Sequence, residues 1–153
     1  MIGNGAIILT VPDAPTNLAE DYSLRAVRQL SVTWSQGYAG GTPVIDYTIS
    51  FSENMGPIQV QAENWLATAY TKTDCNSGST YNIWVQSRNS FGISEYSAAI
   101  QLVCAFIPAI PNPPQTSVIA NNVILTWAAP NNNGANILSY RISIRQKDGQ
   151  FSE

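Results

Sequence analysis

Few residues of the 153-residue chain have side chains suited to acid–base, nucleophilic or metal chemistry. The chain contains no histidine, which removes the commonest general base and the commonest metal ligand. Its two cysteines, Cys75 and Cys104, cannot form a structural zinc site without further ligands nearby. No phosphate-binding loop, nucleophile elbow or pair of acids at catalytic spacing occurs. We therefore expect a protein that is not an enzyme, with no cofactor and no metal site.

The ten carboxylates are scattered along the chain, and only Glu20 and Asp21 are adjacent. Asp13, or Glu20 together with Asp21, could supply oxygen ligands to calcium at a junction between domains, but no complete ligand set is present. Acidic side chains at a protein surface are ordinarily solvated. We interpret these carboxylates as solvated surface groups.

Charge and hydropathy exclude two classes of partner. The net charge is −3 and the seven cations form no run, so we expect no nucleic acid partner. The longest apolar stretch, residues 102–110, is shorter than the roughly 20 residues of a membrane-spanning helix and contains Pro108. The apolar run at residues 6–9 lacks a basic flank and is shorter than the roughly 7 to 15 apolar residues of a signal peptide. We expect no membrane insertion in this segment.

The composition and the apolar pattern predict that these residues lie on β-strands and the loops between them. Only 11% of the residues are charged, and strong helix formers are scarce beside Thr, Val, Ile, Tyr and Trp. In residues 47–51 and 81–85 every second residue is apolar and faces one side of an extended chain. Short strands at this spacing are typical of an antiparallel β-sandwich. We expect seven strands, at 14–20, 28–35, 44–52, 57–62, 66–73, 80–88 and 96–103.

The chain contains an internal repeat. LSVTWS, which includes Trp34, recurs as VILTWA with Trp127, and PVIDYTIS, which includes Tyr47, recurs as NILSYRIS with Tyr140. Both pairs are 93 positions apart (127 − 34 and 140 − 47). One offset shared by two separate motifs indicates two copies of one structural unit.

Four features are diagnostic when taken together: the proline-rich lead VPDAP before the first strand, Trp34 in the second, Tyr47 in the third, and YNIWVQSRNSFGIS at 81–94. In this combination they resemble the fibronectin type III module. The resemblance implies an all-β, seven-stranded antiparallel, immunoglobulin-like sandwich with a partial second module. Tyr81 would be the tyrosine-corner residue, whose hydroxyl binds backbone a few positions upstream. The implied core residues are Trp34, Tyr47 and Tyr81 in the first copy and Trp127 and Tyr140 in the second.

The resemblance and the repeat together divide the chain into parts. Residues 6, 7 and 9 match residues 99, 100 and 102 when 93 is added, so the opening run resembles a last strand. The alternative is that residues 5–10 are the tail of a complete short protein. Prolines favour extended backbone, which predicts a stiff linker, and they also protect strand edges. We expect the last strand of a preceding module at 1–10, a complete module at 11–104, a proline-rich linker at 105–114 and the first half of a second module at 115–153.

The two cysteines are a candidate disulfide in such a sandwich. The family usually has a buried leucine where Cys75 stands, and Cys104 closes the last strand. The turn before the sixth strand and the end of the seventh lie at the same end of this topology, so a bridge is geometrically feasible. The alternative is two reduced cysteines that act as small buried hydrophobes. A disulfide would favour an extracellular or cell-surface location, which the lack of an Asn-x-Ser/Thr sequon slightly weakens.

Three aromatic residues are candidate interface residues. The glycine-rich loops 35–43 and 88–94 should share one end of the sandwich and present Tyr38 and Phe91. Alternation places Trp84 on the outer face of the sixth strand, where most neighbours are polar. The alternatives are that Phe91 packs beneath its loop and that Tyr38 and Trp84 are single surface aromatics, which are common.

The expected function is that of a structural and adhesive module in a longer rod-like tandem array. It would act as a spacer and an interaction scaffold, with neighbouring modules of the same chain and an unidentified protein or glycan as partners. One alternative is an intracellular cytoskeletal or ciliary scaffold with reduced cysteines. The other is an accessory binding module of an extracellular enzyme.

Overall fold

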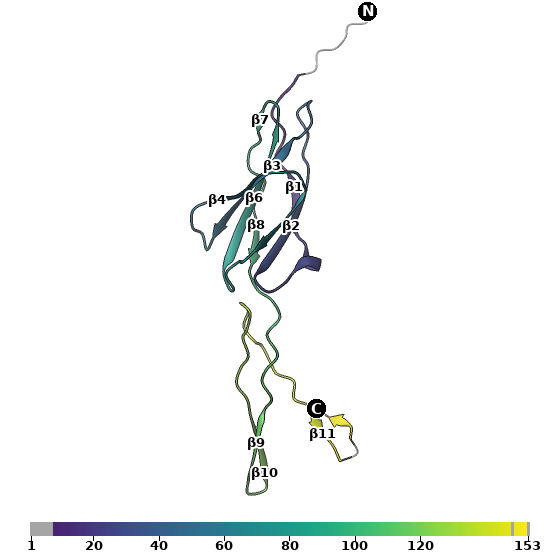
Figure 1. Ribbon diagram of the computed structural model, residues 1–153, viewed down its shortest axis with the longest axis vertical. Helices are drawn as coiled ribbons and strands as arrows, with labels where there is room; N and C mark the ends of the chain where they lie inside the picture. The colour runs from purple at the N-terminus through teal and green to yellow at the C-terminus, as the bar shows by residue number, and fades with distance from the viewer. Residues whose placement is uncertain (1–7, 148, 153) are drawn as a thin grey trace, which may run out of the picture.

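Two antiparallel sheets pack face to face in the computed structural model, which describes residues 8–147 and 149–152 (Figure 1). The first sheet has the order β1–β2–β5, and η1 (Tyr22–Leu24), a single 3-10 turn, connects its first two strands. Its strands are β1 (Thr16–Glu20), β2 (Gln29–Ser35) and β5 (Ala69–Thr73). In the second sheet β4 pairs with β3 and β3 with β6, and both β7 and β8 pair with β6. These strands are β3 (Asp46–Glu53), β4 (Gln59–Trp65), β6 (Thr80–Asn89), β7 (Gly92–Ile93) and β8 (Ile100–Val103).

The alternating apolar residues form the core between the two sheets. Along β6, Ile83 and Val85 are fully buried and alternate with half-buried residues, which is the pattern of a strand with one face inward. Trp34 of β2 meets Tyr47 of β3 across the interface edge to face, with ring centroids 5.4 Å apart and planes at 72°. Both rings are 5% exposed or less. The all-β antiparallel sandwich expected from the sequence is thus confirmed.

The first six expected strands overlap β1 to β6, whereas the last one is different. A continuous strand was expected at 96–103, but the pairing with β6 is divided between β7 and β8. Between them, the hydroxyl oxygens of Ser94 and Ser97 accept hydrogen bonds from the backbone N–H of Ser87 and Val85, at 2.9 and 3.0 Å. Two serine side chains thus take positions that backbone carbonyls occupy in a regular ladder, and the chain bulges away from β6.

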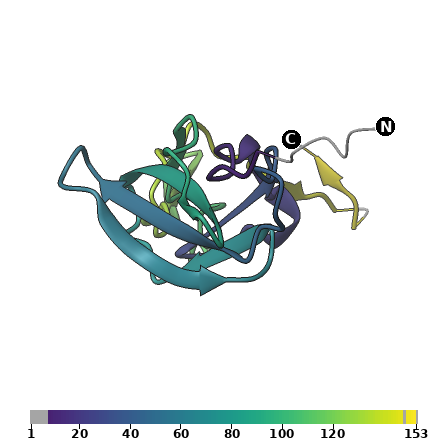
Figure 2. The same ribbon diagram turned by 90° about the horizontal axis from the view of Figure 1, so that it is seen from above.

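The second copy, residues 115–152, forms two separate hairpins below the sandwich (Figure 1). β9 (Gln115–Ile119) pairs with β10 (Asn122–Thr126), and β11 (Ile144–Arg145) pairs with β12 (Phe151–Ser152). Seen from above, the yellow hairpin of β11 and β12 lies to one side of the sandwich (Figure 2).

The prediction that Trp127 and Tyr140 are core residues does not hold for the described part of the chain. Trp127 is 38% exposed and Tyr140 41% exposed, because no second sheet among the described residues covers them. The two rings nevertheless contact each other with centroids 5.4 Å apart and planes at 67°. This is close to the geometry of the Trp34–Tyr47 pair in the first copy.

The expected last strand of a preceding module, at 1–10, falls mostly on residues 1–7, outside the described residues. Residues 8–10 have no regular secondary structure. Within the described residues, no helix is long and apolar enough to cross a membrane.

Candidate functional site at the two poles of the sandwich

Two of the three carboxylates considered for calcium, those of Glu20 and Asp21, have partners within the protein. Oε1 of Glu20 forms an ion pair with Nε of Arg25 at 3.1 Å. Oδ1 of Asp21 accepts hydrogen bonds from the backbone N–H and the hydroxyl of Ser23, at 3.0 and 2.6 Å, and so caps η1. In the part of the chain that the structure describes, no three His, Cys, Asp or Glu side chains are grouped to hold a metal ion. The functional features lie instead at the two ends of the sandwich.

We call these ends the first pole, formed by residues 8–15, 36–45 and 89–92, and the second pole, formed by residues 21–28, 54–58, 74–79 and 104. Each pole is where the chain enters or leaves the sandwich (Figure 1). Loops at the ends of a rigid scaffold are the usual carriers of binding function.

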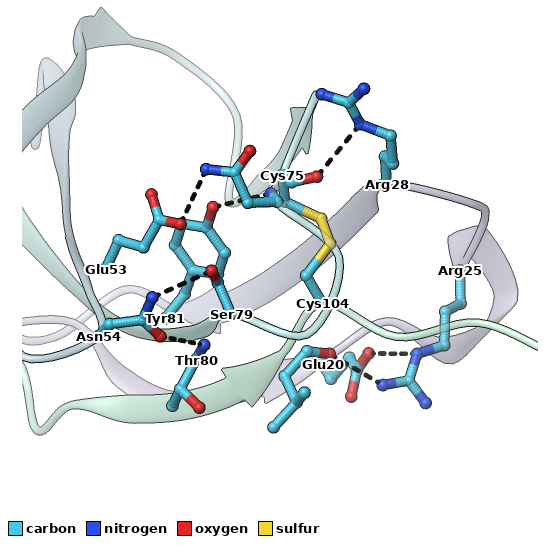
Figure 3. Close-up of a disulfide and its surroundings, with 12 residues drawn as sticks. Glu20, Arg25, Arg28, Glu53, Asn54, Cys75, Ser79, Thr80, Tyr81 and Cys104 are labelled. Atoms are coloured by element: carbon cyan, nitrogen blue, oxygen red, sulfur yellow. Dashed lines mark hydrogen bonds and ion pairs between the residues drawn. A yellow bond between two sulfur atoms is a disulfide. The ribbon is translucent and has the colours of Figure 1, made fainter. Parts of the chain in front are cut away.

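A disulfide between Cys75 and Cys104 holds the second pole together (Figure 3). The Cα atoms are 6.0 Å apart, within the usual range for a bridge, and both side chains are buried. The bridge ties the turn before β6 to the end of β8. Two backbone hydrogen bonds reinforce it, from Gly78 N–H to the Cys104 carbonyl and from Cys104 N–H to the Ser79 carbonyl, both at 2.9 Å.

Tyr81 fixes the same turn from inside the sandwich. Its ring is 2% exposed, and its hydroxyl accepts a hydrogen bond from Asn76 N–H at 3.0 Å (Figure 3). Burial raises the pKa of the Tyr81 phenol, so the neutral form is favoured. Hydrogen bonds from Ser79 and then Asn76 lower the pKa of the Glu53 carboxyl beside it. The turn at 74–79 is therefore bound to three neighbouring strands, β3, β6 and β8.

One side chain, Asn89, joins three segments at the first pole. It ends β6 and is 3% exposed. Its amide nitrogen donates to the carbonyls of Thr10 and Ala39, at 2.8 and 2.9 Å. Its amide oxygen accepts from the N–H groups of Phe91 and Gly92, at 2.8 and 3.2 Å. All four hydrogen-bonding positions of the amide are thus used, and the entering chain is held to two loops.

Two backbone hydrogen bonds also fasten the entering chain to the loop between β2 and β3. Thr10 N–H donates to the Gly40 carbonyl at 2.9 Å, and Asp13 N–H donates to the Tyr38 carbonyl at 2.8 Å. Gly40 has φ of 74°, and a Cβ there would lie 2.3 Å from the Thr10 carbonyl oxygen. Only glycine permits this approach of loop to linker.

The same pair of hydrogen bonds recurs where the chain leaves the sandwich. Phe106 N–H donates to the Asn133 carbonyl and Ala109 N–H donates to the Asn131 carbonyl, both at 2.9 Å. The acceptors lie 93 positions after those of the first pole (133 − 40 and 131 − 38), which is the offset of the sequence repeat. The donors lie 96 positions after theirs (106 − 10 and 109 − 13). The repeat is therefore present in the contacts as well as in the residues.

The three candidate interface residues are not brought together. Tyr38 and Phe91 lie at the first pole and are 65% and 54% exposed. Trp84 lies on the outer face of β6, half-buried beneath Tyr96, with ring centroids 6.4 Å apart. Trp84 is thus partly covered by its own chain, whereas the two rings at the first pole are open to a partner.

The structural roles of Asn89, Ser94, Ser97 and Gly134 were not predicted from the sequence. Asn89 was considered only as part of the loop at 88–94, although a polar side chain at the inward-facing end of a strand is a usable signal. The two serines carry no distinguishing pattern in a chain rich in serine. Gly134 could have been found by aligning the two copies, since it lies 93 positions after Gly41 (134 − 41).

Comparison with known proteins agrees with this architecture. The mouse protein "Fibronectin type III domain containing protein 3C1" is 25% identical over 128 residues, which cover 80% of this chain and 9% of that protein. The chicken "Cell adhesion molecule DSCAM" is 28% identical over 162 residues, which cover 93% of this chain and 7% of that protein. Chicken "Protein sidekick-1" is 25% identical over 150 residues, which cover 89% of this chain and 7% of that protein. The chain spans less than a tenth of the length of these relatives.

Among solved structures, "Titin kinase and its flanking domains" matches 61% of this chain and 17% of that chain, with a TM-score of 0.54 and 20% identity. The twitchin kinase region from C. elegans matches 75% of this chain and 19% of that chain, with a TM-score of 0.53 and 18% identity. At 18% to 20% sequence identity, these structural matches show a shared fold and nothing about function. The profile of the fibronectin type III domain matches residues 13–103, more than half of the chain. This chain belongs to the fibronectin type III domain family.

Proposed function

We propose that the chain is a non-catalytic structural and adhesive module of a longer tandem array, in which it acts as a spacer and an interaction scaffold. The observation that carries the proposal is the recurrence of the linker-to-loop hydrogen bonds. The Gly40 and Tyr38 carbonyls hold the chain that enters the sandwich, and the Asn133 and Asn131 carbonyls hold the chain that leaves it. The second set lies beyond the sandwich and repeats, within residues 106–133, the fastening found within residues 10–40.

The exposed aromatic pair of the second copy supports a tandem arrangement. Trp127 and Tyr140 keep the edge-to-face geometry of Trp34 and Tyr47 without the burial that makes such a pair stabilising. The β9–β10 hairpin also pairs as β1 and β2 do, with a shorter connection. Two hairpins bury too little apolar surface to be stable alone. We infer that further strands complete residues 115–153 as a second sandwich.

An extracellular or cell-surface location fits the disulfide of Cys75 and Cys104, because such bridges persist in oxidising compartments. One relative bears the name cell adhesion molecule. The alternative, an intracellular scaffold, requires both thiols to be reduced. Mass spectrometry after alkylation of the protein from its native source separates the two: a bridged peptide pair supports the surface location, and two alkylated cysteines contradict it.

The tandem array is tested by the sequence that the parent gene encodes beyond residues 1 and 153. The proposal predicts strands after Glu153 that repeat the pattern of residues 57–104, together with a further module before Met1. A parent protein without a second sandwich would refute the array.

We assign the adhesive role to Tyr38 and Phe91, which are exposed at the first pole. A docked preceding module would leave Tyr38 open, since its counterpart Asn131 stays exposed while Gly134 contacts the second pole. We expect cells to attach to a surface coated with the chain, and we expect attachment to fall when Tyr38 and Phe91 are both replaced by alanine. Tyr22→Ala is the matched control, because Tyr22 is 71% exposed but lies at the second pole. Equal attachment to the double variant and the control would remove Tyr38 and Phe91 from the adhesive surface.

A further inference from the structure

Gly134 lies in the loop between β10 and β11 and reaches back to the second pole of the sandwich. Its φ is 92°, and a Cβ there would lie 2.4 Å from the Cys104 carbonyl oxygen and 2.5 Å from the Gly78 nitrogen. The obstructing atoms belong to the backbone, so they cannot swing aside as a flexible side chain would. No residue other than glycine fits this contact without moving the loop away from the pole.

The loop that carries Gly134 is ordered by its own side chains. We call residues 131–134 the glycine loop. Asn133 N–H donates to Oδ1 of Asn131 at 2.9 Å, and Gly134 N–H donates to Oδ1 of Asn132 at 3.1 Å. The Asn133 amide nitrogen donates to the Ile107 carbonyl of the linker at 2.7 Å. The loop is thus shaped before contact and fastened to the linker at the same time.

The surface that the glycine loop meets is equally constrained. Gly78 and Cys104 are joined by a backbone hydrogen bond, and the disulfide from Cys104 to Cys75 holds them in place. Figure 3 shows Cys75, Cys104, Ser79 and Tyr81 converging on this turn. A preshaped loop against a preshaped surface loses little conformational entropy on contact.

We propose that the disulfide-bridged turn at the second pole, with Gly78 and Cys104 at its centre, is a docking surface for the glycine loop of the following module. The joint between the two modules is therefore stiff and set by direct contact, beyond what proline in the linker provides. This inference rests on the proposed tandem array and specifies how its modules meet.

The first pole offers the same loop to a module that precedes. The carbonyls of Tyr38 and Gly40 there accept hydrogen bonds from the entering chain, as those of Asn131 and Asn133 do from the linker. Gly41 lies 93 positions before Gly134 and is exposed, with φ of 81°. Each module thus carries the loop at one end and the docking surface at the other. Contacts between two different surfaces are heterologous and propagate into open-ended arrays.

NMR on the 153-residue chain tests the docking. In the unmodified chain a nuclear Overhauser effect should join the α protons of Gly134 to the amide proton of Gly78, because a Cβ at Gly134 would lie 2.5 Å from the Gly78 nitrogen. Gly134→Ala should shift the Gly78 amide resonance and abolish the contact between these two residues, while the core amide of Val85 is unchanged. Gly149→Ala is the matched control: its φ is 85°, but the nearest atom to an added Cβ is Nη2 of Arg145, at 3.7 Å.

Three outcomes decide the proposal. A shifted Gly78 amide and loss of the Gly134–Gly78 contact in Gly134→Ala, but not in Gly149→Ala, support it. An unchanged Gly78 amide in Gly134→Ala overturns it, and so does the lack of a Gly134–Gly78 contact in the unmodified chain. If the parent protein contains a second sandwich but the joint between the sandwiches is flexible, the docking proposal is wrong and the proposed array stands. If the parent protein lacks that sandwich, the proposed tandem array is wrong.

Discussion

Removing the disulfide should destabilise the sandwich by an amount that follows from the length of the loop it closes. Cys75 and Cys104 are 29 positions apart. For a loop of that length, the chain-entropy relation assigns about 3.6 kcal/mol to the restriction of the unfolded chain. Small domains are stable by only about 5 to 15 kcal/mol, so this is a large share of the total. We therefore expect the double variant Cys75→Ala/Cys104→Ala to lose about 3 to 4 kcal/mol of unfolding free energy.

Urea unfolding followed by tryptophan fluorescence measures this loss, since Trp34 is 5% exposed in the folded chain. With a slope of about 1 to 3 kcal/mol per molar urea, the midpoint should fall by about 1 to 4 M. The unmodified chain in the presence of a reductant should behave as the double variant does, and the variant should not respond to the reductant. Equal midpoints for the oxidised chain and the variant would show that the disulfide does not stabilise the sandwich.

Three further predictions concern the first pole, the divided last strand and alkaline pH. Asn89→Ala should lower the unfolding free energy by about 2 to 3 kcal/mol in urea titration, because it leaves two loops and the entering chain without their shared partner; an effect below about 0.5 kcal/mol, typical of surface changes, would contradict its role. Ser97→Ala should cost about 1 to 3 kcal/mol, because the buried Val85 N–H loses its acceptor; the exposed Ser90→Ala is the control, and equal midpoints for the two would contradict the prediction. Burial raises the pKa of three tyrosines above 10.0, namely Tyr47, Tyr70 and Tyr81. The stability they contribute is complete below pH 10.0 and is lost as the pH rises through their raised pKa values. Urea midpoints that do not fall above that pH would contradict the tyrosine prediction.

The strands could be predicted where burial imposes a period of two. In β3 and β6 one face of the strand lies in the core, so the apolar alternation is local and visible in the sequence. β4 was expected at 57–62 and lies at Gln59–Trp65, because all of its residues are at least partly exposed and carry no such alternation. The division of the last strand depends on serine hydroxyls that bond to β6, which no local pattern in residues 94–99 reveals.

The site could be predicted only where topology alone brings residues together. Cys75 and Cys104 were paired as candidates because the sandwich places their segments at one end. The role of Asn89 depends on carbonyls 50 and 79 positions away, whose direction is set by the folded loops. Gly134 is recognised as a contact residue only once the backbone of the second pole is in place.

Small-angle X-ray scattering tests the claim that the module is a stiff unit of an end-to-end array. The sample is this chain extended by the sequence that follows Glu153 in the parent protein. We expect a rod with a maximum dimension equal to two sandwiches laid end to end, and a narrow distribution of shapes. A compact particle, or the broad distribution of two modules on a free linker, would contradict the claim.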